Sequence, residues 1–380
     1  MKIGIDATFN PHGGSLGHLK EFIDGFSKNL SKTQIILYLK NENIKILDNL
    51  IFEKCNVKIV RLPSYGNFLR ILWVQIFLPI QVKFDEIDIL FCPGNFSPIF
   101  KTTRIKSQWI ATIGPFCKDM YLGMSIYQKF TLFVNKWLIL LSGYTSNLVI
   151  HQAKYSLDLF CQKYKFNAKK QFLIECGKDE FFCSNKQIEK VEGEIKNISN
   201  NDLLCVSHLY PYKNIERLIY AFSSITIDTN NYQKLYIVGK KIHTQYYLRL
   251  EKLVKKLNIK EKVIFTDMIS KNDLKFAYSK CKLFIFPSLC ESSGYTLIEA
   301  MSCGAAILAS DKTAIPFTCK KAALYFDPYS KRDLANKIKS LLQNEIQIKK
   351  MKKKSLQRSS EMINYKQAVQ KFLFITNSII

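Results

Sequence analysis

Two glutamates with seven residues between them, Glu291 and Glu299, are the side chains of this chain best suited to bind a sugar. A carboxylate accepts paired hydrogen bonds from neighbouring hydroxyl groups, such as those of a ribose or a hexose. Two solvated glutamates, one of them favourably placed at a helix start, are the alternative. The residues after Glu291 have backbone amides that suit a phosphate at the beginning of a helix, and they are Ser292, Ser293, Gly294, Tyr295 and Thr296.

A strand, a loop and a helix position these groups. The apolar run 283–286 predicts a buried parallel strand that ends at Pro287. Apolar residues at helical spacing begin near Tyr295, and residues 305–309 predict the next buried strand. Because α/β proteins bind ligands at the carboxyl ends of their strands, we expect both glutamates to face one crevice. This position favours a binding role over the solvated alternative.

The stretch 291–310, ESSGYTLIEAMSCGAAILAS, resembles the Glu-seven-residues-Glu signature of retaining glycosyltransferases of the GT-B fold, family 4. The resemblance implies an α/β chain with two Rossmann-like domains facing each other across a cleft. A nucleoside-diphosphate sugar would be held mostly by the second domain. Glu299 would bind the ribose hydroxyls and Glu291 the hexose hydroxyls, and transfer would retain the anomeric configuration.

A lysine stands immediately before another helical pattern. Lys213 follows a predicted strand, and the apolar stripe of the next helix begins at Ile215. A cation there can neutralise a diphosphate together with the first amides of the helix, whereas a lysine without this context would be solvated. In the resembled family the segment reads Arg-Leu-x-x-x-Lys, and both cations hold the pyrophosphate. Lys213 matches, but His208 takes the arginine position and is charged only when protonated.

The remaining candidates depend more heavily on the resemblance. Gly13 and Gly14 follow the first predicted strand, where a glycine-rich turn lets the backbone approach a phosphate, although glycine also serves plain turns. The resemblance implies that this loop closes over the donor diphosphate or the acceptor, and that Met268 or Ile269 stacks on the nucleotide base. Where many relatives carry a histidine near the reacting carbon, this chain has Gly114, so the amino-terminal contribution to catalysis is unassigned.

Alternating strand-like and helical stretches imply parallel sheets with helices on both faces. We expect an amino-terminal domain over 1–185, a polar linker over 186–202 and a nucleotide-sugar-binding domain over 203–364. The resemblance implies that the helical tail, 365–380, crosses back to the first domain. The predicted strands are 2–6, 34–39, 57–60, 87–91, 109–113, 148–151, 203–207, 235–238, 263–266, 283–286, 305–309 and 323–326.

Composition restricts the class of protein. With 380 residues, 47% hydrophobic and 23% charged, the chain is globular and long enough for two domains. It begins with a strand-like segment rather than a signal peptide, and no apolar run reaches the roughly 20 residues that a bilayer requires. A soluble, cytoplasmic protein is therefore expected. Eleven cysteines lie singly, without Cys-x-x-Cys pairs, which predicts reduced thiols and no metal site.

The net charge of +25 indicates an anionic partner or surface. No nucleic-acid-binding module is recognisable, so no nucleic-acid partner is expected. We interpret the charge, including the lysine run 349–354, as peripheral contact with anionic lipid at the inner membrane face, a solvated helix end being the alternative. The apolar segments 65–82 and 130–141 either pack on a sheet or enter a membrane surface, and we prefer packing on the sheet.

A retaining hexosyltransferase is the predicted function. It would use a nucleoside-diphosphate sugar, no cofactor and no metal, since no Asp-x-Asp motif occurs, and a glycan or lipid-linked acceptor in cell-surface polysaccharide or lipopolysaccharide synthesis. One alternative is a nucleotide-sugar epimerase of the same fold, against which the glutamate pair argues. The other is a non-catalytic partner subunit of a polysaccharide assembly complex, for which Gly114 and His208 are the support.

Overall fold

The computed structural model describes most of the chain, and the sheets and helices below are those of the described part. The described residues are 2–9, 22–26, 34–40, 56–60, 67–184, 188, 190–228 and 233–379, with only the backbone of 56–60, 67 and 226–228. The glycines predicted to approach a phosphate, Gly13 and Gly14, lie outside these residues.

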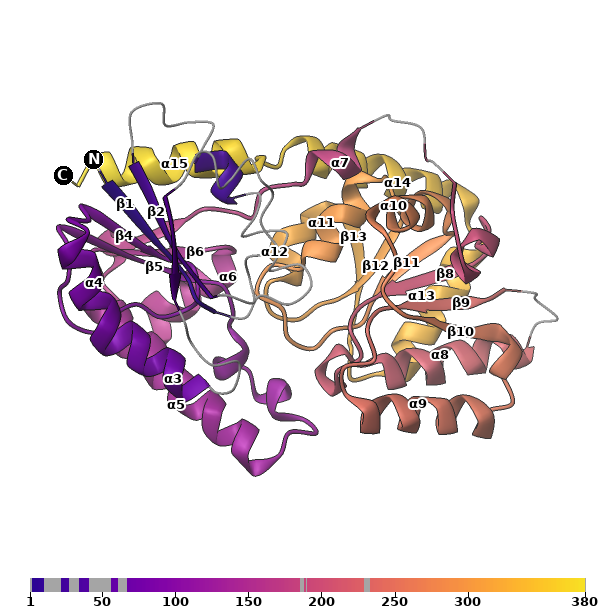
Figure 1. The fold of residues 1–380 in the computed structure, drawn as a ribbon. Coiled ribbons are helices and arrows are strands. Elements are labelled where there is room, and N and C mark those ends of the chain that lie inside the picture. Colours follow the sequence, from indigo (N-terminus) through magenta and orange to yellow (C-terminus); the bar gives the residue numbers. More distant parts are fainter. Residues whose placement is uncertain are drawn as a thin grey trace. The chain divides into compact units, whose positions relative to one another are not determined.

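The chain folds into two compact units (Figure 1). The first comprises Met1–Phe116, Met124–Gly177 and Ile363–Ile380, and the second comprises Cys117–Gly123 and Lys178–Met362. The expected linker, 186–202, is thus counted with the second unit. Two apolar side chains of this stretch, Ile195 and Ile198, are buried there.

Among the described residues, seven parallel strands form the sheet of the first unit in the order β3-β2-β1-β4-β5-β6-β7. The order reverses between β1 and β4, which are adjacent at the centre of the sheet. The strands are β1 (Lys2–Ala7), β2 (Gln34–Lys40), β3 (Asn56–Val60), β4 (Ile89–Cys92), β5 (Ile105–Ile110), β6 (Leu148–His151) and β7 (Gln171–Leu173).

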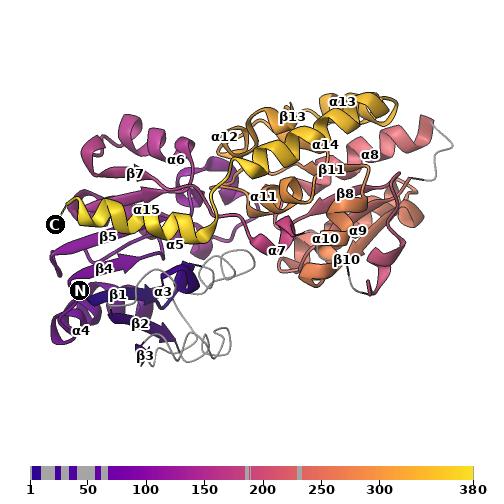
Figure 2. The same ribbon diagram turned by 90° about the horizontal axis from the view of Figure 1, so that it is seen from above.

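Helices cover both faces of this sheet because its strands alternate apolar side chains between two cores. Ile89 and Phe91 of β4 face a core that includes α15 (Tyr365–Asn377) and the helical residues 22–26. Figure 2 shows α15 lying over these strands. Leu90 and Cys92 face the other core. It is covered by α3 (Asn67–Leu72), the π-helix η2 (Trp73–Phe77), α4 (Leu78–Phe84) and α5 (Ile126–Thr145).

The predicted strand 109–113 is wrong in position, since β5 spans Ile105–Ile110. The strand β5 contains three consecutive polar residues, which hid it from sequence reasoning. All three are buried and have hydrogen-bond partners inside the unit. Lys106 Nζ donates to the carbonyl oxygen of Pro98 at 2.6 Å, and Gln108 donates to the carbonyl oxygen of Asn95 at 2.6 Å. Ser107 donates to the carbonyl oxygen of Leu90 at 3.0 Å. Residues after 110 instead form a loop and η3 (Gly114–Phe116).

The second unit has a parallel sheet in which six described strands follow the order β10-β9-β8-β11-β12-β13. The predictions 235–238, 263–266, 283–286 and 323–326 are confirmed, whereas β12 begins two residues later than expected. The strands are β8 (Leu203–Val206), β9 (Leu235–Val238), β10 (Val263–Thr266), β11 (Leu283–Phe286), β12 (Ile307–Ser310) and β13 (Ala323–Phe326).

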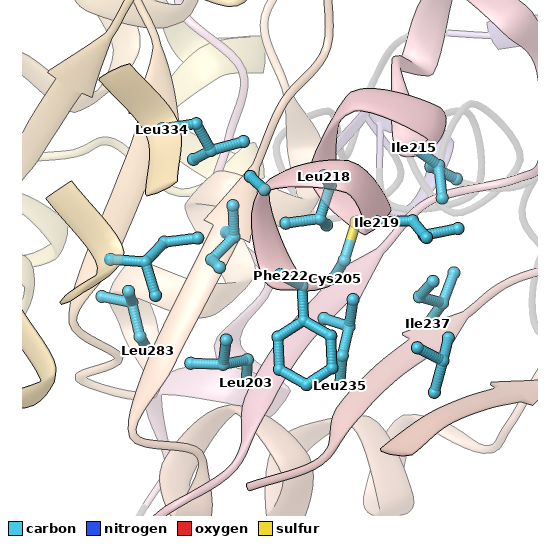
Figure 3. Packing of buried hydrophobic residues seen from close by; sticks show 14 of the residues in the cluster. Leu203, Cys205, Ile215, Leu218, Ile219, Phe222, Leu235, Ile237, Leu283 and Leu334 are labelled. Carbon is cyan, nitrogen blue, oxygen red and sulfur yellow. The ribbon is translucent and has the colours of Figure 1, made fainter. Parts of the chain in front are cut away.

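The largest apolar core of this unit lies between its sheet and the helices α8, α9 and α13. Leu203 and Cys205 of β8 contact Leu218 and Phe222 of α8 there (Figure 3). Every second residue of β8 enters this core, as expected for a buried parallel strand. The helices of the unit are α7 (Glu180–Cys183), α8 (Ile215–Asp228), α9 (Thr244–Lys256), α10 (Lys271–Lys280), α11 (Tyr295–Ser302), α12 (Ile315–Cys319), α13 (Lys331–Leu342) and α14 (Glu345–Ser360).

Candidate functional site

Lys213 and Glu291 come from two loops at the point where the strand order of the second unit reverses. β8 and β11 are neighbours at the centre of the sheet; β9 lies beyond β8 on one side, and β12 beyond β11 on the other. Lys213 ends the short helix η8 (Pro211–Lys213) after β8, and Glu291 lies in the loop after β11. Doubly wound sheets bind ligands outside the carboxyl ends of their strands at such a reversal.

The two side chains form a partly buried ion pair. Lys213 Nζ donates to Glu291 Oε1 at 2.5 Å, and the side chains are 16% and 13% exposed. The ammonium group also lies 5.2 Å from the ring centre of Tyr212 and 5.8 Å from that of Phe286. Burial disfavours the charged form of Lys213, but the hydrogen-bonded carboxylate of Glu291 together with Tyr212 and Cys290 outweighs it, so the pKa of Lys213 is raised above its ordinary value. The site therefore contains a permanent cation.

Asn214 fixes the loop that carries Lys213. Its backbone is left-handed, with φ of 62°, a conformation that asparagine tolerates better than most residues. The buried side chain donates to the carbonyl oxygens of Pro287 at 3.0 Å and Pro328 at 2.9 Å, so it connects the loops after three strands. Arg217 of α8 donates to Asn214 Oδ1 at 2.7 Å. Sequence reasoning missed Asn214, although an asparagine before a helix start was a signal.

The backbone of Glu291 is fixed from the loop after β12. The amide of Glu291 donates to Thr313 Oγ1 at 2.9 Å, and the amide of Ala314 donates to the Glu291 carbonyl oxygen at 3.4 Å. Thr313 has φ of 50°, which is unusual for a β-branched residue. Strained backbone of this kind persists only where surrounding contacts require it. The position of Glu291 is thus determined by two loops.

Gly294 lets the chain turn from this loop into α11. Its φ is 77°, and a Cβ there would lie 2.8 Å from Leu297 Cδ1, so only glycine fits without strain. The preceding residue, Ser293, is buried, and its carbonyl oxygen accepts a hydrogen bond of 2.6 Å from Thr318 Oγ1. Ser292 and Thr296 are partly exposed beside it. The positive end of α11 is thereby placed beside the loop of Glu291.

Glu299 lies one to two turns into α11 and has a different environment from Glu291. Tyr278 Oη donates to Glu299 Oε2 at 3.1 Å. Burial raises the pKa of Glu299 to about 7, although the hydrogen bond from Tyr278 opposes the shift. The two glutamates thus share the strand–loop–helix unit predicted from the sequence, one paired with a cation and the other with a phenol. Sequence reasoning did not anticipate Tyr278.

Comparison with known proteins places this geometry in a family. Residues 186–358 match the family model described as glycosyl transferases group 1. The O-antigen chain mannosyltransferase RfbU of Salmonella typhimurium is 30% identical over 305 residues, which are 77% of this chain and 78% of RfbU. The chain belongs to the group 1 glycosyl transferases.

Other proteins that are similar to this group 1 glycosyl transferase align with it over different fractions of their own length. The serotype-specific mannosyltransferase WbdA of Escherichia coli is 28% identical over 186 residues, 48% of this chain. The chain thus matches only 23% of the length of WbdA.

Two solved structures agree along the whole chain and support the expected GT-B fold of two Rossmann-like units. Sucrose-phosphate synthase from Thermosynechococcus elongatus has 17% identity, a TM-score of 0.75 and coverage of 100% and 98%. HepE from Anabaena, solved with UDP and glucose, has 17% identity, a TM-score of 0.72 and coverage of 100% of both chains.

The structure also locates the positions at which this family member departs from the family pattern. His208, in the place of the family's arginine, is partly exposed, and its Nδ1 accepts a hydrogen bond of 3.2 Å from the amide of Lys240. Gly114, in the place of the family's histidine, belongs to the first unit, where its amide donates to Thr112 Oγ1 at 3.0 Å. Met268, after the edge strand β10, is 60% exposed.

One segment of this glycosyl transferase was not anticipated near the site. Residues 117–123, which include η4 (Lys118–Tyr121), belong to the second unit. The thiol of Cys290 shares a hydrogen bond with Cys117, which together with burial raises the pKa of Cys290 well above its ordinary value. Tyr329 Oη donates to Asp119 Oδ2 at 2.7 Å. The loop that precedes Glu291 is therefore supported by a segment far away in the sequence, a contact that no local pattern predicts.

Two general features complete the description of the site and its unit. Across the residues that the structure describes, no three His, Cys, Asp or Glu side chains gather closely enough to hold a metal ion. In the same residues, every helix is too short or too polar to traverse a lipid bilayer.

Proposed function

We propose that this chain is a retaining hexosyltransferase that moves a sugar from a nucleoside-diphosphate donor to a glycan or lipid-linked acceptor, without a metal. The observation that carries the proposal is the Lys213–Glu291 pair at the reversal point of the second sheet, beside the positive end of α11. A permanent cation and a helix N-terminus together suit a diphosphate. Family membership supports the same reaction class.

The proposed mechanism is electrostatic. Negative charge grows on the leaving diphosphate as the bond between the sugar and phosphate breaks, and Lys213 and the first amides of α11 stabilise that charge. Glu291 accepts hydrogen bonds from hexose hydroxyls and at the same time orients Lys213. The acceptor hydroxyl attacks from the side of the leaving phosphate, which takes its proton, so the anomeric configuration is retained.

Glu299 is proposed to bind the ribose of the donor. Its carboxylate form accepts hydrogen bonds from the two ribose hydroxyl groups, while Tyr278 Oη donates to Glu299 Oε2. His208 would add a second positive charge near the diphosphate only when its imidazole is protonated. Met268, which is exposed after β10, remains the proposed contact of the nucleotide base.

The names of related proteins suggest which donors to examine first. RfbU and WbdA are named mannosyltransferases, and the HepE structure contains UDP and glucose. We therefore propose a hexose donor based on GDP or UDP and an acceptor of the cell-surface polysaccharide or lipopolysaccharide type. The charge of +25 supports peripheral contact with anionic lipid at the membrane where such acceptors are built.

A thermal-shift screen of the purified chain tests the donor site. UDP, GDP, ADP and CMP are compared, each with its common sugar conjugates. A ligand at a hundred times its dissociation constant stabilises the folded state by about 2.7 kcal/mol. We expect a shift with one nucleotide series, lost in Glu299→Ala and retained in Lys252→Ala, an exposed lysine of α9. Removal of the cation in Lys213→Ala should lower transfer about 10²–10³-fold.

A non-catalytic partner subunit is the second candidate, favoured by Gly114 and His208 in place of the family's histidine and arginine. Folded protein that shifts with none of the nucleotides would support it and contradict the proposed enzyme. Conversion of the donor sugar to its epimer without any acceptor would instead indicate an epimerase. Retention is read directly from the anomeric configuration of the product by NMR.

A further inference from the structure

The first unit exposes a row of large apolar side chains along α5. Their exposed fractions range from 45% at Leu141 to 88% at Ile126, and from Tyr127 onward their spacing of three to four residues places them on one side of the helix. The row contains three aromatic types, and its members are Ile126, Tyr127, Phe130, Phe133, Trp137, Leu141 and Tyr144.

A second exposed row runs along α3, η2 and α4 and continues into the loop after β4. Phe84 is 80% exposed and Phe100 is 77% exposed at its end. The expectation that this segment packs on the sheet holds for one side of it, where Val74 and Leu78 are buried. The exposed members of the second row are Phe68, Ile76, Phe77, Ile80, Phe84 and Phe100.

Both rows lie on the outer side of the same layer of helices. The buried sides of α5 and of the segment 67–84 enter one core, on the sheet face that Leu90 and Cys92 of β4 also reach. Figure 1 shows α3, α4 and α5 on that side of the first sheet. The opposite sheet face is covered by α15. A recess, described in the next paragraph, opens at the end of the second row. The two rows and this recess together are called the apolar-basic face.

The charged residues of the two helical segments that carry the rows have one sign. Neither α5 nor the segment 67–84 contains an acidic residue, whereas Lys83, Lys129 and Lys136 lie among the apolar positions. A recess of about 370 Å³ opens where the second row ends. Three cations line it, and they are Lys83, Lys101 and Arg104.

The lining of this recess suits an anionic group. Its acidic residue, Glu86, is already paired with Lys2 at 2.7 Å. Thr102 also lines the recess, and among the described residues its buried hydroxyl oxygen has no hydrogen-bond partner. A phosphate that entered the recess would meet cations and a hydroxyl group rather than a carboxylate.

We propose that the apolar-basic face binds the surface of an anionic lipid bilayer and that the Lys83–Lys101–Arg104 recess receives a lipid phosphate. This inference rests on the proposed action of the enzyme on a membrane-side acceptor and names the surface involved. Helices that carry exposed aromatic and aliphatic rows with cations among them are typical of a membrane interface. The lysine run 349–354 on α14, which the sequence suggested, has no comparable apolar row beside it.

Vesicle co-sedimentation tests the proposal. The full chain is mixed with phosphatidylcholine vesicles that contain or lack phosphatidylglycerol. We expect sedimentation only with phosphatidylglycerol, weakened by salt. Two variants remove different components of the face, Ile126→Ser with Phe130→Ser for the apolar row and Lys83→Gln with Lys101→Gln for the recess. The lysine pair should lose roughly 25-fold in partitioning, since each cation near an anionic surface contributes roughly 5-fold.

Matched controls address the rest of the molecule. Phe374→Ser changes a side chain that is 76% exposed on α15, over the opposite sheet face, and should leave sedimentation unchanged. Lys349→Gln with Lys350→Gln changes the run on α14 and should also have no effect. Each variant is first shown to retain the parent's thermal unfolding temperature.

Three outcomes would overturn the proposal. They are equal sedimentation with neutral vesicles, equal loss in the Phe374 or Lys349–Lys350 controls, and full binding by both face variants. Conversion of a dimer to a monomer in Ile126→Ser with Phe130→Ser, without any change on vesicles, would assign the face to a second copy of this chain. The nucleotide-induced thermal shift is measured in parallel, so a failure of the donor site is recognised separately from a failure of the face.

Discussion

At the scale of single residues, the site depends on two carboxyl groups with opposite environments. Glu291 is paired with Lys213, so its charge is matched before any ligand arrives. Glu299 has a phenol as its partner and a pKa raised to about 7 by burial. One carboxyl group is therefore held in an ion pair, and the other gains and loses a proton near neutrality.

The protonation of Glu299 makes a testable contribution to stability. Its pKa is about 7 in the folded chain, above the value of about 4.3 that glutamate has when unfolded. The folded state therefore binds the proton more tightly, and stability falls as pH rises from the unfolded value through the folded one. Between about pH 6 and about pH 8 the loss should be about 1 kcal/mol.

Glu299→Gln removes this titration and provides the comparison. Urea unfolding of the parent and of Glu299→Gln should diverge as pH rises, with the variant gaining relative stability. Glu361→Gln, at an exposed carboxylate that ends α14, is the control and should follow the parent. A constant difference between parent and Glu299→Gln across this range would contradict the raised pKa.

At the scale of secondary-structure elements, the site is formed by the loops that follow β8, β11, β12 and β13. Asn214 connects three of them through hydrogen bonds to the carbonyl oxygens of Pro287 and Pro328. These bonds satisfy buried backbone acceptors that would otherwise cost free energy. The loop of Lys213 is thus stabilised by the same side chain that orders its neighbours.

Replacing Asn214 tests this connection. Asn214→Gly keeps the left-handed backbone but removes both hydrogen bonds, and we expect the free energy of unfolding to fall by about 1–3 kcal/mol. Asn258→Gly is the matched control because Asn258 also has a left-handed backbone, with φ of 55°, but is exposed. Equal effects of the two substitutions in urea unfolding would show that the hydrogen bonds of Asn214 contribute nothing measurable.

Sequence reasoning located the elements that are determined by residues close together in the sequence. It missed those that depend on contacts between distant residues. β9, β10, β11 and β13 were predicted to the residue because each is a short apolar run bounded by polar or turn residues. β5 was displaced because its polar residues Lys106, Ser107 and Gln108 are buried against partners distant in the sequence. The Glu291–Glu299 spacing and Lys213 were visible for the same local reason. Tyr278, Asn214 and the segment 117–123 were not, since their roles arise from tertiary contacts.

At the scale of the whole molecule, each unit is assembled from segments that are separate in the sequence. The first unit is completed by residues 363–380, which follow the entire second unit along the chain. α15 contributes Val369 and Phe372 to the first core, and Phe372 lies 5.0 Å from Phe91 of β4 between ring centres. The stability of the first unit therefore depends on residues that follow the second unit in the sequence.

Phe372→Ala should separate the stability of the first unit from ligand binding in the second. Truncating a fully buried phenylalanine costs about 3–5 kcal/mol, because apolar surface is lost and a cavity is left. Phe374→Ala, two residues further along α15 at a side chain that is 76% exposed, should cost far less. Lys213 and Glu291 lie in the other unit, so the nucleotide-induced rise in unfolding temperature should persist in Phe372→Ala under conditions where the protein is folded. Calorimetry with and without the nucleotide measures both effects.

Equal destabilisation by the two substitutions would show that α15 does not anchor the first core. Loss of nucleotide binding in Phe372→Ala alone would show that the two units are energetically coupled.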